Sequence, residues 1–586
     1  MLPSAAMASP LTTVKRLLER PMRLPRMRAY VPKPDDPAIF WFNGERDDIV
    51  REVVRRLEAR LGPPGTATKP PLEYVLNDCA NEEARRLYSQ RDDETKQSLR
   101  FWRGVIKRVG KMSDADRRAM FHEICERMAK DVAGNFDPRV YSFATRVVPH
   151  ALTGILKPSS LPADLASIGS GHGSPVDELM TTEGDIERLR RLGKIGTLVF
   201  VPTHLSNLDS VVLGYALMRA DLPPVVYGAG KNLFSNPIVS FFMHNLGAYR
   251  VDRRIRAQLY KDVLKTYSCV MIERGYHSLF FPGGTRSRSG MVERRLKLGL
   301  AGTAVEAFAN NRVRGIDRPV FFVPTTINYA LVLEAETLIE DWLKEAGKSR
   351  YIIEDDEFSQ LDRWIAFIRK LGEVESPAVL RFADPIDPFG NPVDDQGRSI
   401  APDGRTIDPG GYVSARGKPS VDARRDAAYT REMGQHLVKV YERETVLMGT
   451  QLVSHVLFRR LVHDTPGVDL FGRLRQRGEI TMPRADLERE LGIAQERLRA
   501  MEERGEVRLS QAARALPPRE LFDRVMAAFN GYHRRTILRI ADDGGVILED
   551  PTLLLYYQNR CIAYAERIAD EGNLAAAREI ARMGHA

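Results

Sequence analysis

The chain has 586 residues, 43% of them apolar and 28% charged, which is enough apolar material for several packed domains and excludes a disordered chain. Its 87 basic and 78 acidic side chains leave a net charge of +9, a mild excess that favours anionic partners without choosing among phosphate groups, lipid headgroups and nucleic acid. The four cysteines are far apart and form no Cys-x-x-Cys pair, which argues against a disulfide scaffold or a cysteine-rich zinc site and is consistent with a reducing compartment.

Residues 1–44 are interpreted as a basic N-terminal tail. The tail lacks the apolar core of a secretory signal, and no window of about 18 uninterrupted apolar residues in the chain predicts a spanning helix. Such a tail is either a solvated end of the chain or a contact with anionic lipid. It contains a basic stretch with Lys15, Arg16, Arg20, Arg23, Arg26 and Arg28.

Residues 45–166 are predicted to form a helical N-terminal domain. In Asp47–Leu61 apolar residues recur every three to four positions, which is typical of a helix with one buried face. Further helical patterns cover Glu82–Tyr88, Gln97–Val109 and Asp114–Val132. The small-residue stretch 167–175 (SIGSGHGSP) is interpreted as a linker.

Residues 176–386 alternate between short apolar runs and helical patterns, which predicts an α/β domain with helices packed on a sheet. The predicted strands are Gly196–Pro202, Leu222–Gly228, Ser278–Pro282, Pro319–Pro324 and Val379–Pro385.

A histidine follows the first of these strands and an aspartate stands five residues later, in THLSNLDS. A loop that leaves a strand and enters a helix lets the Asp209 carboxylate turn back toward the His204 imidazole. That pairing fixes one tautomer, so the other ring nitrogen can accept a proton. A histidine after a strand is also a common structural residue, so its context has to decide.

Three further segments supply that context. Gly247–Arg254 is basic, Phe281–Gly290 (FPGGTRSRSG) combines glycines with arginines, and Val323–Tyr329 closes another strand. Glycines let the backbone approach an anion, and guanidinium groups match phosphate oxygens. Together these strand-end segments predict a site for a ligand that carries a phosphate.

The four segments resemble the blocks of the glycerolipid acyltransferase superfamily: His-x4-Asp, Gly-Ala-aromatic…Arg, Phe-Pro-Glu-Gly-Thr-Arg-Ser, and Val-Pro-x-x-x. The resemblance implies an α/β fold with a mixed sheet flanked by helices, between helical N- and C-terminal domains. Finer similarity to the glycerol-3-phosphate branch, the PlsB type, lies in Leu222–Phe234, Gln258–Tyr267, Glu273–Gly290, Val323–Glu334 and, weakly, Leu553–Ala565.

By this resemblance His204 is the general base on the sn-1 hydroxyl of glycerol 3-phosphate, and Asp209 orients it. The acyl donor is acyl-CoA or acyl-carrier protein, and neither a metal nor another cofactor is implied. The residues implied to hold the glycerol phosphate are Arg253, Gly284, Arg286, Arg288, Ser289 and Lys297. Those implied to shape the acyl or substrate pocket are Pro324 and Thr325.

The sequence departs from this pattern at three positions. Gly283 replaces the usual glutamate of the third block, Asp252 stands where the glycerol-3-phosphate branch tends to have arginine, and Leu205 follows the histidine where arginine is common. These departures leave a 1-acylglycerol-3-phosphate acyltransferase as an alternative. Gly283 also raises the alternative of a degenerate, non-catalytic fold, against which the presence of both His204 and Asp209 argues.

Residues 387–422, rich in Pro, Gly and Asp, are predicted to be a long surface loop, and 423–586 a helical C-terminal domain. Thr481–Leu509 is interpreted as helix, turn, helix and strand, an order that resembles a winged-helix module. That motif leaves a nucleic-acid-binding protein as an alternative from another class. Acidic residues interleave with its arginines, so we expect no nucleic-acid partner.

Because its lipid substrates partition into bilayers, the implied enzyme is expected to work at an anionic membrane surface, as a peripheral protein on the cytoplasmic side. Asn236–Leu246 groups apolar residues beside the basic second block and is either an interfacial or a core helix.

Overall fold

The computed structural model describes residues 30–65, 70–88, 93–145, 180–230, 237–346 and 378–583. Most of the predicted basic tail and the whole predicted linker 167–175 lie outside the described residues. The chain divides into two compact units, one of Met1–Ala144 with Val226–Tyr267 and one of Thr145–Val225 with Ser268–Ala586. The segment Val226–Tyr267, predicted within the α/β domain, is thus grouped with the N-terminal helices.

The first unit is mainly helical, as predicted for the N-terminal region. Helix α5 has the predicted bounds, and Ser113 caps it by accepting a hydrogen bond from the Asp116 backbone N–H. In α2 the apolar stripe of Ile49, Val53 and Leu57 is buried. The elements are η1 (Ala38–Trp41), α2 (Phe42–Ala59), α3 (Leu72–Leu87), α4 (Asp93–Arg108), η2 (Val109–Lys111), α5 (Asp114–Val132), β3 (Val226–Gly230), α11 (Pro237–Asn245) and β4 (Ala248–Val251). Helix α12 (Gln258–Glu273) begins in this unit and ends in the other.

Strand β4 corrects the interpretation of Gly247–Arg254 as only a basic segment. Ala248 and Tyr249 are buried, and β4 pairs in parallel with β3, with Tyr227 opposite Ala248. The apolar run of β4 is too short to be recognised beside its arginines. Strand β3 begins at Val226, four residues after the predicted start.

The second unit carries five strands of the central sheet, namely β1, β2, β5, β6 and β7. The full sheet has seven strands in the order β1-β7-β6-β2-β5-β3-β4. Strands β1–β7, β6–β2 and β2–β5 pair in parallel, and β6–β7 pair antiparallel, so the predicted mixed sheet flanked by helices is confirmed. Its elements in this unit are β1 (Met180–Glu183), α9 (Ile186–Ile195), β2 (Thr197–Pro202), α10 (Asp209–Arg219), β5 (Ser278–Leu279), α13 (Ala301–Val313), β6 (Val320–Tyr329), α14 (Ala335–Ala346) and β7 (Ala378–Phe382).

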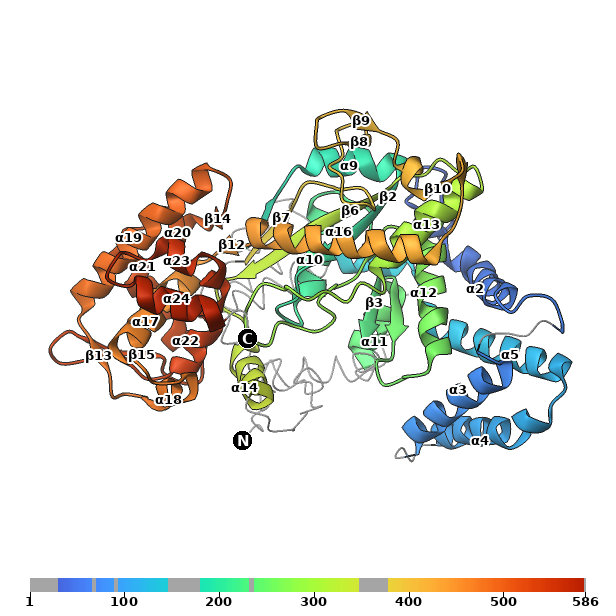
Figure 1. Cartoon of the computed structure of the whole chain (residues 1–586), viewed down its shortest axis with the longest axis horizontal. Helices are drawn as coiled ribbons and strands as arrows, with labels where there is room; N and C mark the ends of the chain where they lie inside the picture. The colour runs from blue at the N-terminus through green and yellow to red at the C-terminus, as the bar shows by residue number, and fades with distance from the viewer. Residues whose placement is uncertain are drawn as a thin grey trace, which may run out of the picture. The chain divides into compact units, whose positions relative to one another are not determined.

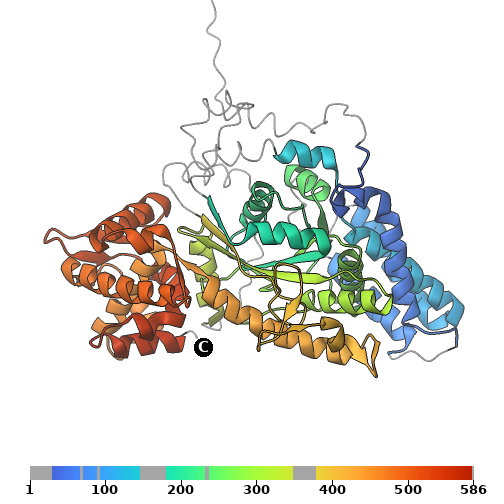
Figure 2. The same cartoon turned by 90° about the horizontal axis from the view of Figure 1, so that it is seen from above.

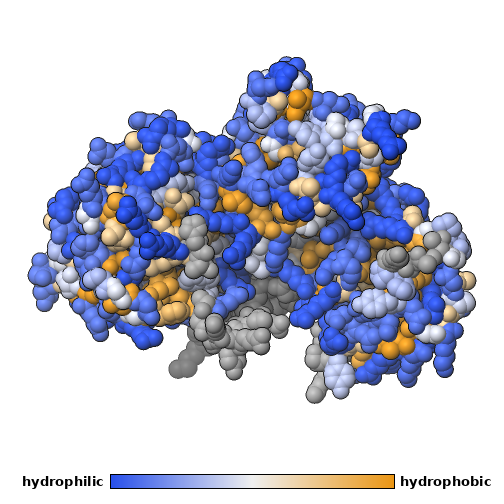
Figure 3. Space-filling view, viewed as in Figure 1, coloured by the Kyte–Doolittle hydropathy of each residue, from blue (hydrophilic) through white to orange (hydrophobic). Residues whose placement is uncertain are grey.

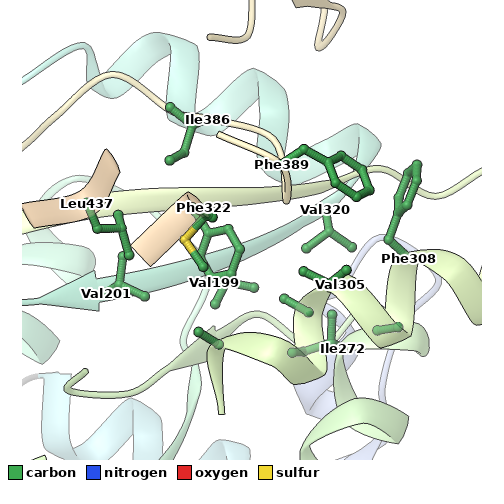
Figure 4. Close-up of a cluster of buried hydrophobic side chains, with 14 of the residues drawn as sticks. Val199, Val201, Ile272, Val305, Phe308, Val320, Phe322, Ile386, Phe389 and Leu437 are labelled. Carbon is green, nitrogen blue, oxygen red and sulfur yellow. The ribbon is translucent and has the colours of Figure 1, made fainter. Parts of the chain in front are cut away.

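Helices α13 and α16 (Ala423–Glu444) cover one face of this sheet, and α16 runs across β6 and β2 (Figure 1). The core between them contains alternate residues of the two strands, because successive side chains of a strand point to opposite faces. Figure 4 shows these side chains packed together: Val199, Val201, Val305, Phe308, Val320, Phe322 and Leu437.

The predicted loop 387–422 contains short paired strands. Strand β8 (Ser399–Ile400) pairs with β9 (Thr406–Ile407), and β10 (Ser414–Ala415) with β11 (Lys418–Pro419); η6 spans Pro409–Val413. Gly404 and Gly417 lie in the turns with positive φ, which glycine adopts without strain. Turn chemistry therefore organises the segment into tight hairpins.

The C-terminal region is helical as predicted, and the helices that follow α16 gather into one bundle (Figure 2). Within it the buried helix α17 contacts α19, α21, α22 and α24. The elements are β12 (Val446–Leu447), α17 (Gly449–Asp464), α18 (Leu470–Arg475), β13 (Thr481–Met482), α19 (Arg484–Glu503), β14 (Arg508–Leu509), α20 (Gln511–Ala515), α21 (Pro518–Tyr532), β15 (Leu538–Ile540), β16 (Val546–Leu548), α22 (Pro551–Gln558), η7 (Asn559–Tyr564), α23 (Ala565–Ile568) and α24 (Leu574–Met583).

The winged-helix interpretation of Thr481–Leu509 is wrong. One continuous helix, α19, replaces the predicted helix-turn-helix, and β14 pairs in parallel with β12 instead of forming a wing hairpin. Gly492 does not break the helix because the apolar stripe on either side of it continues into the bundle. The buried residues of that stripe are Leu487, Leu491, Ala494, Leu498 and Met501.

Candidate active site

The predicted histidine and aspartate meet in the loop that joins β2 to α10. His204 Nδ1 lies 2.7 Å from Asp209 Oδ2, and Asp209 is the first residue of α10. The same carboxylate oxygen accepts hydrogen bonds from the backbone N–H groups of Leu205 (2.7 Å) and Ser206 (3.0 Å). The loop is thus folded around the Asp209 carboxylate, and the helix N-terminus adds a favourable dipole. With the Nδ1 proton donated to Asp209, the lone pair of the imidazole lies on Nε2.

Tyr329, at the end of β6, completes the surroundings of Asp209. Its hydroxyl donates to Asp209 Oδ1 at 2.7 Å, and both residues are buried. Burial and the nearby Asp209 carboxylate raise the pKa of Tyr329, so its hydroxyl keeps the proton it donates. Asp209 is therefore satisfied on both oxygens and is held in one orientation behind the histidine.

The third block holds His204 from its other side. The Phe281 ring stacks on the imidazole with 4.2 Å between ring centroids, and the Ser287 backbone N–H donates to the His204 carbonyl at 2.8 Å. The His204 backbone N–H in turn donates to Glu293 Oε1 at 2.6 Å. Contacts from one segment thus fix both the ring plane and the backbone of the histidine.

A second buried carboxylate, Glu334, ties Arg286 to the same loop. It accepts hydrogen bonds from the Ser206 hydroxyl (2.9 Å) and the Asn207 backbone N–H (3.0 Å), and Arg286 Nη1 lies 3.1 Å from it. Burial raises the pKa of Glu334, and the Arg286 guanidinium opposes that rise. Arg286 is therefore oriented beside the His204 loop by a group that sequence reasoning did not single out.

Gly284 and Lys297 are also brought together as predicted site residues. Gly284 has a φ of +74°, and a Cβ there would lie 3.0 Å from Lys297 Cε and 3.1 Å from Nζ. The exposed Lys297 side chain thus lies over a backbone position that only glycine can occupy. The backbone N–H of Lys297 donates to the Pro282 carbonyl at 2.6 Å.

Arg288 and Ser289 make contacts outside the immediate surroundings of His204. Arg288 Nη1 lies 2.8 Å from Glu345 Oε2 at the surface, and the Ser289 carbonyl accepts from Asn559 Nδ2 at 2.8 Å. Their assignment to the acceptor phosphate stays a prediction.

Pro324 and Thr325 lie buried within β6, opposite Val201 and Pro202 of β2. The Thr325 carbonyl accepts from the Thr203 N–H at 3.0 Å, directly before His204. In this position they support the loop, and their role in an acyl pocket stays a prediction. Arg253 is exposed in the turn after β4, in the other compact unit, and its role in phosphate binding also stays a prediction.

Sequence reasoning did not assign roles to Tyr329, Glu334 and Glu293. Tyr329 and Glu334 stand in VPTTINYALVLE, a segment similar to the glycerol-3-phosphate branch. Polar residues at the end of a predicted strand and just beyond it could therefore have been predicted as site residues. Glu293 gave no signal, because its contact with His204 joins residues 89 positions apart. Within the described ranges, no group of three or more His, Cys, Asp or Glu side chains is arranged to hold a metal ion.

Comparison with known proteins finds a family model and relatives that match part of this chain. Residues 184–328 match the family model described as Acyltransferase. The chain is 32% identical over 202 residues to a glycerol-3-phosphate acyltransferase of Histophilus somni, and 32% identical over 171 residues to one of Pseudomonas paraeruginosa. These matches cover 34% and 29% of this chain, and 23% and 20% of the relatives, so the chain aligns with less than a quarter of the length of either.

Among solved structures, the 1-acyl-sn-glycerophosphate acyltransferase PlsC of Thermotoga maritima is 17% identical and covers 44% of this chain and 71% of its own, with a TM-score of 0.23. The fold assigned above rests on the sheet itself. The sheet, the His-x4-Asp loop and the family match define residues 184–328 as an acyltransferase domain. Within that class, the chain is similar over about a third of its length to glycerol-3-phosphate acyltransferases.

Proposed function

We propose that this protein is a glycerol-3-phosphate O-acyltransferase, which moves a fatty acyl group from acyl-CoA or acyl-carrier protein to the sn-1 hydroxyl of glycerol 3-phosphate. The observation that carries the proposal is the 2.7 Å contact between His204 Nδ1 and Asp209 Oδ2, with Arg286 held beside the same loop. The relatives named above support the choice of acceptor, since both are glycerol-3-phosphate acyltransferases.

The proposed reaction uses His204 as a proton carrier. Nε2 takes the proton of the acceptor hydroxyl as its oxygen attacks the thioester carbonyl, and Asp209 stabilises the imidazolium that forms. A new C–O ester bond forms, the C–S bond breaks, and the imidazolium returns its proton to the departing thiolate. A positioned general base contributes about 10²–10⁴-fold to such a rate, and no metal or redox group enters this scheme.

Arg286 is the guanidinium we assign to the acceptor phosphate. It lies in the block that also contacts His204, and its side chain remains partly exposed while bonded to Glu334. The guanidinium has a planar fork of N–H donors that matches phosphate oxygens. A phosphate bound there would hold the acceptor hydroxyl near the imidazole.

One observation favours lysophosphatidate as a second candidate acceptor. Asp252, which stands where the glycerol-3-phosphate branch tends to have arginine, has a structural role here. Its carboxylate is buried and lies 3.0 Å from Arg254 and 3.4 Å from Arg86. Asp252 therefore organises the second block differently from an arginine at that position.

The test is an acyl-transfer assay with the purified chain, offering glycerol 3-phosphate and lysophosphatidate as acceptors, and acyl-CoA and acyl-carrier protein as donors. We expect a higher kcat/KM with glycerol 3-phosphate. Higher turnover of lysophosphatidate would favour the second candidate. Absence of turnover with every pair of substrates would contradict an acyltransferase function.

We also propose that the protein works at an anionic membrane surface, as a peripheral protein on the cytoplasmic side. Helices long and apolar enough to cross a bilayer are not found in the described part of the chain. The face in Figure 3 is mainly hydrophilic with small hydrophobic patches, and Phe241, Phe242 and Met243 of α11 are only half-buried. Cosedimentation with anionic vesicles that weakens at high salt, and is absent with zwitterionic vesicles, is the expected result.

A further inference from the structure

Gly283 leaves a space that another residue fills. A Cβ on residue 283 would lie 3.1 Å from Cγ and 3.6 Å from Oε1 of Glu293. The side chain of Glu293 therefore lies against the position where the resembled third block usually has its glutamate. The carboxylate comes from ten positions further along the chain, after the loop has turned back.

This carboxylate contacts the catalytic loop directly. Glu293 Oε1 accepts the His204 backbone N–H at 2.6 Å, while the Ser287 N–H donates to the His204 carbonyl at 2.8 Å. A backbone amide that donates to an ionised carboxylate makes a shorter and stronger hydrogen bond than one that donates to a neutral group. The backbone of His204 is thus held on one side by the third block and on the other by Glu293, which follows that block, independently of the bond from its ring to Asp209.

The C-terminal helical domain supplies a positive charge to the same place. Arg560, in η7, is 2% exposed, and its Nη1 donates to the carbonyl of Met291, two residues before Glu293. Its Nε and Nη2, and Oε2 of Glu293, are buried without a hydrogen-bond partner among the described residues. Burial raises the pKa of Glu293, and Arg560 acts in the opposite direction. The buried guanidinium thus favours the charged form of the carboxylate and opposes the effect of burial, which remains the larger of the two.

Two more contacts join this part of the C-terminal region to the third block. Asn559 Nδ2 donates to the Ser289 carbonyl at 2.8 Å, and Gly290, with a φ of +79°, lies against the Tyr556 carbonyl. A side chain on residue 290 would collide with that backbone. The third block is therefore fitted to the segment 556–560.

We propose that Glu293 is a positioning residue for His204, a relocated carboxylate that takes the place of one at residue 283, and that the buried guanidinium of Arg560 in the C-terminal domain stabilises its negative charge. The inference rests on the proposed function in that His204 is the base it positions. It assigns a catalytic purpose to the contact between the C-terminal helices and the acyltransferase domain, since the charge that holds the carboxylate comes from outside that domain.

Relocating the carboxylate tests the proposal. Gly283 does not need a positive φ, so a side chain there is free of backbone strain once Glu293 is shortened. Glu293→Ala should lower kcat about 10²-fold with little change in either KM, because a misplaced base costs rate more than binding. Adding Gly283→Glu to Glu293→Ala should restore most of the loss, and adding Gly283→Gln should not. Glu442→Gln, at a surface carboxylate bonded to Arg294, is the matched control and should leave kcat unchanged.

Hydrogen exchange measured on peptides that contain residues 203–209 gives a readout that does not depend on activity. Glu293→Ala, and Glu293→Gln as the variant that keeps the volume, should lose protection of the His204 amide at an unchanged melting temperature. The Gly283→Glu/Glu293→Ala variant should regain it. Equal rescue by Gly283→Gln, or unchanged protection in Glu293→Ala, would overturn the proposal.

The role of Arg560 is tested by a double-mutant cycle of Arg560→Gln and Glu293→Gln. If the arginine acts through the carboxylate, the double variant should lose no more activity and amide protection than Glu293→Gln alone. Additive losses would overturn the part assigned to Arg560. A wild-type chain without turnover would instead contradict the proposed function, and the exchange data would still decide whether Glu293 holds the loop.

Discussion

Charged side chains gather around His204 and along helix α19, and the two regions use them in different ways. Around His204, carboxylates from three separate segments are buried and bonded to backbone amides, a ring nitrogen and a tyrosine hydroxyl. On α19, arginines pair with acids close to them in sequence, such as Arg484 with Glu488 and Arg489 with Asp486. Convergence of charge on a few buried groups characterises a site, whereas local pairing of charge characterises a solvated helix face.

The largest effect is expected at the centre of the site. His204→Ala should lower kcat by about 10²–10⁴-fold with no loss of stability, because the imidazole supplies proton transfer and the fold is held by other groups. The measurement is steady-state acyl transfer together with a thermal unfolding curve. Retained turnover in the folded variant would show that His204 is not the catalytic base, and the contrast between its surroundings and α19 would lose its functional meaning.

Glu444 is a buried carboxylate that we expect to stabilise the fold and not to take part in catalysis. It accepts hydrogen bonds from Arg381 (2.7 Å) and Arg508 (3.1 Å), which join α16 to β7 and β14. Burial alone would raise the pKa of Glu444, but these arginines lower it from 4.5 to about 2. A carboxylate with a lowered pKa stabilises the fold above about pH 4.5, and that stability is lost as pH falls toward 2.

Glu444→Gln should therefore lower the free energy of unfolding by roughly 3 kcal/mol at pH 7, and the difference from wild type should vanish near pH 2. Denaturant titrations across this range measure it. Glu442→Gln, two residues away and half-exposed, is the control, and it should cost less than about 1 kcal/mol. A difference independent of pH would show that the contacts of Glu444 stabilise by packing alone.

Arg286→Ala should raise the KM for glycerol 3-phosphate about tenfold and leave the KM for the acyl donor nearly unchanged, since loss of a hydrogen bond to a charged group costs about 1.5–3 kcal/mol. Arg288→Ala, whose arginine pairs with Glu345 at the surface, distinguishes a single phosphate ligand from a cluster. An unchanged acceptor KM in both variants would remove the phosphate role from the third block.

The smallest effect is expected on α19. Arg489→Gln and Arg504→Gln remove exposed charges paired with Asp486 and Glu506, and each should change stability by less than about 0.5 kcal/mol. Acyl transfer should be unaffected. In filter binding with a salt titration, we expect the two variants and the wild type to have the same affinity for duplex DNA. A salt-dependent affinity that the variants lose would restore the nucleic-acid alternative.

The errors of sequence reasoning concern short or locally ambiguous segments. Strands β1 (MTTE) and β4 (AYRV) have four residues each and contain polar or charged side chains, so neither presents the short apolar run that marks the predicted strands. In α19 the residues Leu491-Gly492 resemble a turn, and only packing against the bundle decides for a continuous helix. The capped helix α5, with its long apolar stripe, was predicted to the residue.

The amino-acid sequence by itself determined the α/β class, the helical flanking regions and the His204–Asp209 pair, because strand and helix periodicities and a five-residue spacing are local properties of the chain. Only the tertiary structure decided that Tyr329, Glu334 and Glu293 surround that pair, and that Arg560 donates to the carbonyl of Met291, two residues before Glu293. Those contacts join residues from 89 to 128 positions apart along the chain, and Arg560 is more distant still. Their closeness depends on how β6 and the C-terminal helices pack, and periodicity carries no information about that packing.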